Sequence, residues 1–129
     1  YIAYCFAEKK GYSKFGNYTG NGNADGPFVY TGFKPAFVMG KISSGSTNNW
    51  FIFDTTRDTF NLTQRKLRPD TNAAENNNSS KAIDIYSNGF KIKNNDGEFN
   101  TNNSTYIYAA FAEEPLVANV GASIPATAR

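Results

Sequence analysis

The sequence contains no histidine, and it has only one cysteine, one tryptophan and one methionine among its 129 residues. Without histidine the chain cannot build a Ser-His-Asp or Cys-His catalytic system or an imidazole-ligated zinc site. The single Cys5 cannot form an internal disulfide, and one thiol does not make a metal site. No apolar run approaches the roughly 20 residues of a membrane-spanning helix, so no membrane insertion is expected. These absences favour a binding or structural module over an enzyme.

Charge is also sparse. Charged residues make up 19% of the chain and the formal net charge is +2. The basic residues are spread out, apart from Arg65, Lys66 and Arg68, so the sequence has no nucleic-acid footprint and no nucleic-acid partner is expected. At this length the chain is one domain, too short for two.

What the sequence does contain is aromatic and amide side chains. Aromatic residues reach 16%, with eleven Phe and eight Tyr, and there are seventeen Asn, eleven Thr and nine Ser. Aromatics favour strands, whereas Asn and Gly favour turns, so the composition predicts an all-β domain with many loops.

One sequence segment occurs twice. Residues 1–8 (YIAYCFAE) and 106–113 (YIYAAFAE) match at five of eight positions, and both have the alternation of a strand. Residues 1–8 could be the last strand of a preceding repeat, could pair within this domain's own sheets, or could be donated to a neighbouring copy. The chain starts inside this pattern, as though cut from something longer. Cys5 aligns with Ala110, so we expect it to be a small buried residue rather than a reactive thiol.

Short strand-like runs separated by turn signals fill the rest of the chain. They predict a two-sheet antiparallel sandwich of the jelly-roll type over residues 1–114, followed by an extended C-terminal arm over 115–129. Asn88-Gly89 predicts a tight hairpin because Gly accepts positive φ. The expected strand runs are Tyr12–Tyr18, Phe28–Thr31, Phe37–Ser43, Trp50–Asp54, Ala82–Ser87 and Phe90–Lys93, with a weaker one at Phe60–Leu67 and polar loops at 69–80 and 94–103.

A resemblance to a known family runs through nearly the whole chain. It is carried by GYSKFGNYTGNGNADGPFVYTGFKPAFVMGK, WFIFDTTRD, AIDIYSNGFKIK and TYIYAAFAEEPLVANV. These stretches resemble a domain of unknown function that recurs in large tail-fibre-like proteins of phages, many from aquatic metagenomes. The resemblance implies a concanavalin-like (laminin-G-like) β-sandwich at the C-terminal end of a virion fibre or structural protein. It implies no catalytic residue and no cofactor.

Trp50 is the first candidate for ligand binding. Its ring beside the amides of Asn48 and Asn49 suits stacking on a sugar while hydrogen-bonding the hydroxyls, although we favour the alternative that Trp50 is a core residue at the start of the most buried strand. Tyr18 could contribute its hydroxyl at the rim or belong to the core. Asp54 and Arg57 could bind sugar hydroxyls, but with Asp58, Arg65, Arg68 and Asp70 we favour an ion-pair network that holds a long connection. A glycosidase would need two carboxylates about 5–9.5 Å apart, and no spacing here pairs them.

Two further sets of residues have distinct expectations. Asn21, Asn23 and Asp25 have the spacing of a calcium-loop start, but residue 32 is Gly where the loop needs an acidic ligand, so we favour an Asx-rich turn and expect no metal. The apolar ends of the chain are expected to mediate assembly: Tyr1, Ile2, Tyr4, Phe6, Leu116, Val117, Val120 and Ile124.

The sequence therefore predicts a non-enzymatic surface module of a virion, extracellular and without cofactors. Adhesion to host-surface glycans is the leading function. The alternative is a structural subunit that assembles with copies of itself or with other virion proteins through strand exchange and its terminal arm.

Overall fold

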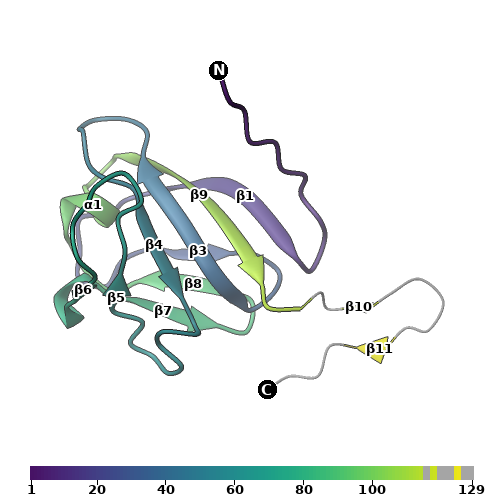
Figure 1. The fold of residues 1–129 in the computed structure, drawn as a ribbon. Helices are drawn as coiled ribbons and strands as arrows, with labels where there is room; N and C mark the ends of the chain where they lie inside the picture. Colours follow the sequence, from purple (N-terminus) through teal and green to yellow (C-terminus); the bar gives the residue numbers. More distant parts are fainter. Residues whose placement is uncertain (115–116, 119–123, 126–129) are drawn as a thin grey trace.

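Runs of aromatic and β-branched residues, separated by turn-forming residues, produce two main antiparallel sheets. In the computed structural model, which describes residues 1–114, 117–118 and 124–125, a four-stranded sheet has the order β1-β9-β3-β4 and a three-stranded sheet has the order β2-β8-β7 (Figure 1). Small two-stranded pairs, β5-β6 and β10-β11, complete the set of sheets in this part of the chain. The strands are β1 (Ser13–Thr19), β2 (Phe28–Tyr30), β3 (Pro35–Ile42), β4 (Phe51–Asp54), β5 (Arg65–Lys66), β6 (Asn76–Asn77), β7 (Ile83–Tyr86), β8 (Gly89–Ile92), β9 (Thr105–Ala112), β10 (Val117–Ala118) and β11 (Ile124–Pro125), and the helices are η1 (Ser79–Lys81) and α1 (Gly97–Asn100).

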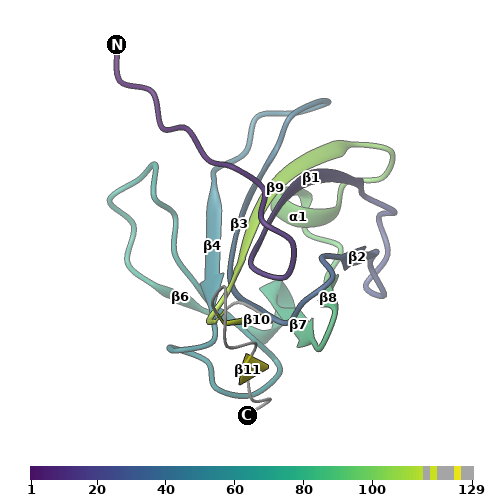
Figure 2. The same cartoon turned by 90° about the vertical axis from the view of Figure 1, so that its right-hand side faces the viewer.

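The two sheets face each other across one hydrophobic core. Alternate residues of β3 and β9 point inward, among them Val38, Tyr106 and Ala110, all fully buried. Phe90 of β8 meets the other sheet edge-to-face, with its ring centroid 5.5 Å from that of Tyr108. Figure 2 shows the layers from the side, with β4, β3 and β9 on one side and β7 and β8 on the other. The predicted antiparallel sandwich is confirmed, while the jelly-roll and concanavalin-like assignments stay predictions.

The predicted strands were mostly placed correctly, with two exceptions at the ends of the chain. Residues 1–8 do not join a sheet of the described chain; they run outward, and only Lys9 makes a bridge, to Ser13. Cys5 is therefore exposed, which corrects its expected burial beside its aligned counterpart Ala110. Within the expected C-terminal arm, the short strands β10 and β11 pair antiparallel; Leu116 and Val120 lie outside the described residues.

No helix in the described part of the chain has the length and apolarity needed to cross a membrane.

Candidate functional site

Trp50 lies at the surface end of β4 rather than in the core. The residue is half-buried, and the Nζ atom of Lys41 lies 5.6 Å from the ring centroid. Its backbone N–H donates to Asp70 Oδ2 at 3.2 Å, which ties this junction to the loop after β5. The core alternative for Trp50 is thus wrong, because Phe51 and Phe53 fill the inward positions of β4.

The two asparagines that precede Trp50 lie in the connection between β3 and β4. The amide nitrogen of Asn48 donates to the Gly97 carbonyl at 2.9 Å, so this side chain attaches the β3–β4 connection to α1. Asn49 is half-buried in the same connection. We refer to Trp50, Asn48 and Asn49 together as the Trp50 ledge.

Tyr18 is not part of any surface site. Only 7% of the residue is exposed, its ring stacks on Tyr106 at a centroid distance of 5.0 Å, and its hydroxyl donates to the Phe99 carbonyl at 2.8 Å. Burial raises the pKa of this phenol. The expectation that Tyr18 contacts a ligand is therefore corrected: its hydroxyl holds α1 against β1.

Asp54 and Arg57 lie at the opposite end of β4 from the Trp50 ledge. Asp54 accepts from the Arg57 backbone N–H at 2.8 Å and from Arg57 Nε at 2.5 Å. Arg57 also pairs with Glu75 at 2.9 Å, which joins the turn after β4 to the 69–80 loop. Burial raises the pKa of Asp54, but the hydrogen bonds from Arg57 outweigh it and the net pKa is lowered. The favoured ion-pair network forms among Asp54, Arg57, Asp58 and Arg65, joined by Glu75, which the sequence had not indicated. Arg68 pairs with Glu98 instead, and Asp70 accepts from the Trp50 backbone N–H, so the prediction is wrong for these two residues.

Asp58 organises the connection that follows. One carboxylate oxygen accepts from the backbone N–H groups of Gln64 and Arg65, at 2.7 and 2.6 Å. The other lies 3.6 Å from Arg65 Nε. These contacts close residues 58–65 into a fixed loop, so an irregular segment gains a defined shape.

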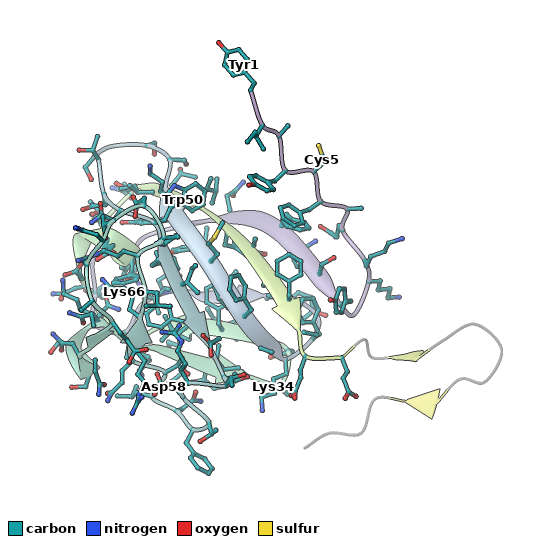
Figure 3. The ribbon with its side chains drawn as sticks, viewed as in Figure 1. Tyr1, Cys5, Lys34, Trp50, Asp58 and Lys66 are labelled. Carbon is teal, nitrogen blue, oxygen red and sulfur yellow. The ribbon has the colours of Figure 1, made fainter. Side chains whose placement is uncertain are left out.

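A shallow pocket of about 180 Å³ opens where this loop meets the sandwich. Phe60 stands at its wall with 84% of its surface exposed, which is unusual for an aromatic residue. The side chain of Asn61 has a structural role: its amide nitrogen donates to the Ile85 carbonyl, and its amide oxygen accepts from the Ile85 N–H. Figure 3 shows Lys34 and Asp58 near each other on this side, away from Trp50. The lining residues are Lys34, Thr55, Asp58, Thr59, Phe60, Asn61, Thr63 and Ile85.

The pocket was not predicted from the sequence. Its residues are spread from Lys34 to Ile85, and no local motif joins them. The available signal was Phe60 itself, one of two large apolar residues, with Leu62, in the mostly polar connection between β4 and β5.

Asn21, Asn23 and Asp25 form the favoured Asx-rich turn. Asn21 donates to the Asp25 carbonyl at 3.0 Å and accepts from the Asn23 N–H at 3.0 Å. Asp25 pairs with Lys91 at 2.7 Å. The fully buried Asn100, which the sequence gave no reason to single out, holds the turn by donating to Asn21 and to the Asn23 carbonyl. Among the described residues, no group of three or more His, Cys, Asp or Glu is placed to hold a metal ion.

A second unpredicted cluster is buried beside α1. Lys66 of β5 donates to Glu98, and Arg68 makes two further hydrogen bonds to the same carboxylate, at 2.9 and 2.8 Å. Burial raises the pKa of Glu98, but these donors outweigh it and the net pKa is lowered. With all of its oxygens engaged, the cluster links β5 to α1 rather than presenting a reactive group.

The residues expected to mediate assembly are exposed at the N-terminus. Tyr1, Ile2, Tyr4 and Phe6 each have two thirds or more of their surface accessible. The backbone of Val117 and Ile124 lies in β10 and β11.

The fold and site together define an all-β sandwich domain with a small pocket of mixed polar and apolar lining and an exposed apolar N-terminal segment. The chain belongs to the family described as domain of unknown function DUF7483, whose model matches residues 1–115. Searches of curated proteins and of solved structures gave no match.

Proposed function

We propose that this domain is a non-enzymatic adhesion module that binds host-surface glycans. The observation that carries the proposal is the pocket at the end of β4, where the exposed Phe60 ring stands beside hydroxyl, ammonium and carboxylate groups. Sugars present apolar C–H faces and polar hydroxyls together, so an aromatic platform with a few polar groups suits them. At about 180 Å³ the pocket is smaller than the roughly 300–1,000 Å³ of drug-sized sites, which favours a single sugar unit.

The Trp50 ledge is a second proposed contact. The backbone N–H of Trp50 donates to Asp70, Lys41 lies over the Trp50 ring, and Asn49 is the preceding residue. A small pocket and a ledge would each bind weakly, so avidity from repeated copies would supply most of the affinity. The location on a virion, in an extracellular setting, is supported by the resemblance to phage tail-fibre-like proteins.

A glycan array probed with the multimerised domain tests this proposal. We expect binding to one glycan class, reduced about tenfold or more by Phe60→Ala, since covering a Phe side chain with an apolar sugar face contributes up to about 1.5–3 kcal/mol and each 1.4 kcal/mol is about tenfold in affinity. Trp50→Ala measures the contribution of the ledge. The matched control is Tyr30→Ala, because Tyr30 is also an exposed aromatic (65%) but lies on β2, outside the pocket.

Two outcomes contradict glycan adhesion. One is no binding to any glycan by the multimerised wild-type domain. The other is equal loss of binding in Phe60→Ala and Tyr30→Ala, which would mean that the pocket has no special role.

The second candidate function is a structural subunit of a fibre or particle. It is favoured by the apolar N-terminal segment, which is exposed in this chain and repeats the sequence of β9. Deletion of residues 1–8, and separately of 115–129, should abolish assembly while the circular dichroism spectrum stays unchanged. Unchanged assembly in both deletions would rule this function out.

A further inference from the structure

The four-stranded sheet is apolar on both of its faces. On the side away from the core, the register places Phe111 beside Phe37, and Ala109 between Phe15 and Met39. Paired residues share a face, so these side chains form one continuous surface. Antiparallel sheets with one solvated face normally alternate apolar and polar residues, whereas this sheet does not. We call this surface the outer patch: Phe15, Phe37, Met39, Ile52, Ile107, Ala109 and Phe111.

The outer patch remains partly exposed in the single chain. None of its members is buried, and 41% of Ile107 is accessible. The rings of Phe15 and Phe37 lie 5.6 and 6.0 Å from that of Phe111. A continuous apolar surface of this kind marks an interaction site.

The N-terminal segment already has a contact with the outer patch. Phe6 stacks on Phe15 at 5.8 Å and meets Phe111 edge-on at 6.0 Å. Beyond Phe6 the chain leaves the domain on the side opposite the three-stranded sheet (Figure 2), and Figure 3 shows Tyr1 far from the sandwich. Ile2 and Tyr4 are more than 80% exposed.

We propose that the outer patch binds a second copy of this chain, with Tyr1, Ile2 and Tyr4 of each copy packing on the patch of the other. The segment projects from the same side as the patch, so two copies that meet face to face place each segment alongside the opposite sheet. The contact is then self-complementary, as a two-fold interface requires. The inference rests on the assembly function and is independent of glycan binding.

The area of the outer patch indicates that an interface between two copies would include the N-terminal segment as well as the sheet. Four strands about 4.8 Å apart and 7, 8, 8 and 4 residues long, at about 3.4 Å per residue, give a face of about 440 Å². A standard interface buries about 800 Å² on each partner. Two tyrosines and an isoleucine supply the missing area, since a buried aromatic side chain contributes about 150–250 Å².

The backbone offers a second contact for the same segment. Within the described residues β9 is the only strand that pairs with β1; on the other edge of β1 Ser13 forms a bridge with Lys9, and the rest of that edge, beside the patch, has no strand partner. Residues 1–8 have the sequence pattern of β9, the strand that pairs with β1 on its occupied side. The partner's segment can therefore extend the sheet at β1 while its side chains cover the patch.

Sedimentation velocity of residues 1–129 over a range of concentrations tests the proposal. We expect a dimer whose dissociation constant rises at least tenfold in Ile107→Lys and in Tyr4→Lys. Both side chains are exposed in the single chain, so both variants should keep the wild-type melting temperature; Ile107→Ser is the milder alternative if the lysine variant melts earlier. The matched control is Tyr30→Lys on the other sheet, for which we expect no change.

The outcomes separate this inference from the assembly function. A chain that stays monomeric at all concentrations overturns it, as does a dimer that Ile107→Lys weakens no more than Tyr30→Lys does. If deletion of residues 1–8 dissociates the assembly but Ile107→Lys does not, assembly stands and the outer patch is excluded as its interface.

Discussion

Among single residues, Lys66 is unusual because it is a charged side chain buried in the domain. Its side chain is completely buried, with Nζ 4.9 Å from the centroid of the Phe99 ring and hydrogen-bonded to Glu98. Burial lowers the pKa of Lys66, and the hydrogen bond that its ammonium donates to Glu98 opposes that effect. A buried pair of this kind contributes little over apolar residues of the same volume, but breaking it is costly.

We therefore predict that Glu98→Gln lowers the free energy of unfolding by about 3–5 kcal/mol, because Lys66 would be left buried without a counter-charge. Chemical denaturation measures the loss. The double variant Lys66→Met/Glu98→Gln should recover most of it, since it removes the unpaired charge. Equal stability of the single and double variants would contradict this explanation.

The contacts of some single residues could not be predicted from the sequence. Of seventeen asparagines, Asn100 is the one that holds the 21–25 turn, through hydrogen bonds to Asn21 and to the Asn23 carbonyl. The sequence could indicate that asparagines form turns, but not which one is buried beneath another loop. The sequence also could not indicate the ion pairs of Glu98 and Glu75, because their arginine partners are distant in sequence.

Among the elements, the β7–β8 hairpin was predicted for a reason that is only partly right. The turn residues are Ser87 and Asn88, because Tyr86 pairs with Gly89. Gly89 was expected to take positive φ, yet the described glycines that do so are Gly11, Gly22, Gly32 and Gly45. Gly89 is instead the first residue of β8, where a Cβ atom would lie 2.2 Å from the Val29 carbonyl oxygen. Glycine is required there by close approach of β2, which local sequence cannot reveal.

Gly89→Ala should consequently separate β2 from β8 and lower the free energy of unfolding by about 1–3 kcal/mol, the usual cost of overpacking. Thermal denaturation of the purified variant provides the measurement. Gly97→Ala is the matched control, because its Cβ would come no nearer than 3.3 Å to the Thr101 hydroxyl. A Gly89→Ala variant as stable as Gly97→Ala would show that β2 can shift without cost.

The sequence predicted which strands exist better than it predicted which of them contact one another. The strong runs gave β1 to β4 and β7 to β9 because their alternation is local, whereas the two-residue strands β5 and β6 and the short helix α1 have no such pattern. The candidate site was harder still: the pocket needs Lys34, the loop closed by Asp58 and the β7 residue Ile85 together, and only the tertiary fold brings them into contact.

For the molecule as a whole, three carboxylates, one buried (Glu98) and two half-buried (Asp54 and Asp96), determine the response to acid. Burial raises the pKa of Asp54, Asp96 and Glu98, but hydrogen bonds from their basic and backbone partners outweigh it and leave each pKa lowered. A lowered folded-state pKa stabilises the protein above the unfolded value, about 4, and this stability is lost as the pH falls through the folded value.

The free energy of unfolding should therefore be nearly constant above about pH 5 and fall steeply below about pH 4. Urea denaturation between pH 2 and pH 7 measures the profile. The Lys66→Met/Glu98→Gln variant should show a shallower fall because one of the three carboxylates is gone. A profile that is flat down to pH 2, or that has the same slope in both proteins, would contradict the assignment.

The pairing of β1 with β9 has a consequence for how the domain is made. The first strand of the sandwich meets the last long one, and side-chain contacts such as Tyr18 to Phe99 span 81 residues. A topology dominated by such distant contacts has high contact order, and domains of this kind fold in milliseconds to seconds rather than microseconds. During synthesis on the ribosome, the four-stranded sheet cannot close until β9 has emerged, so the strands made before it must wait with their apolar faces uncovered.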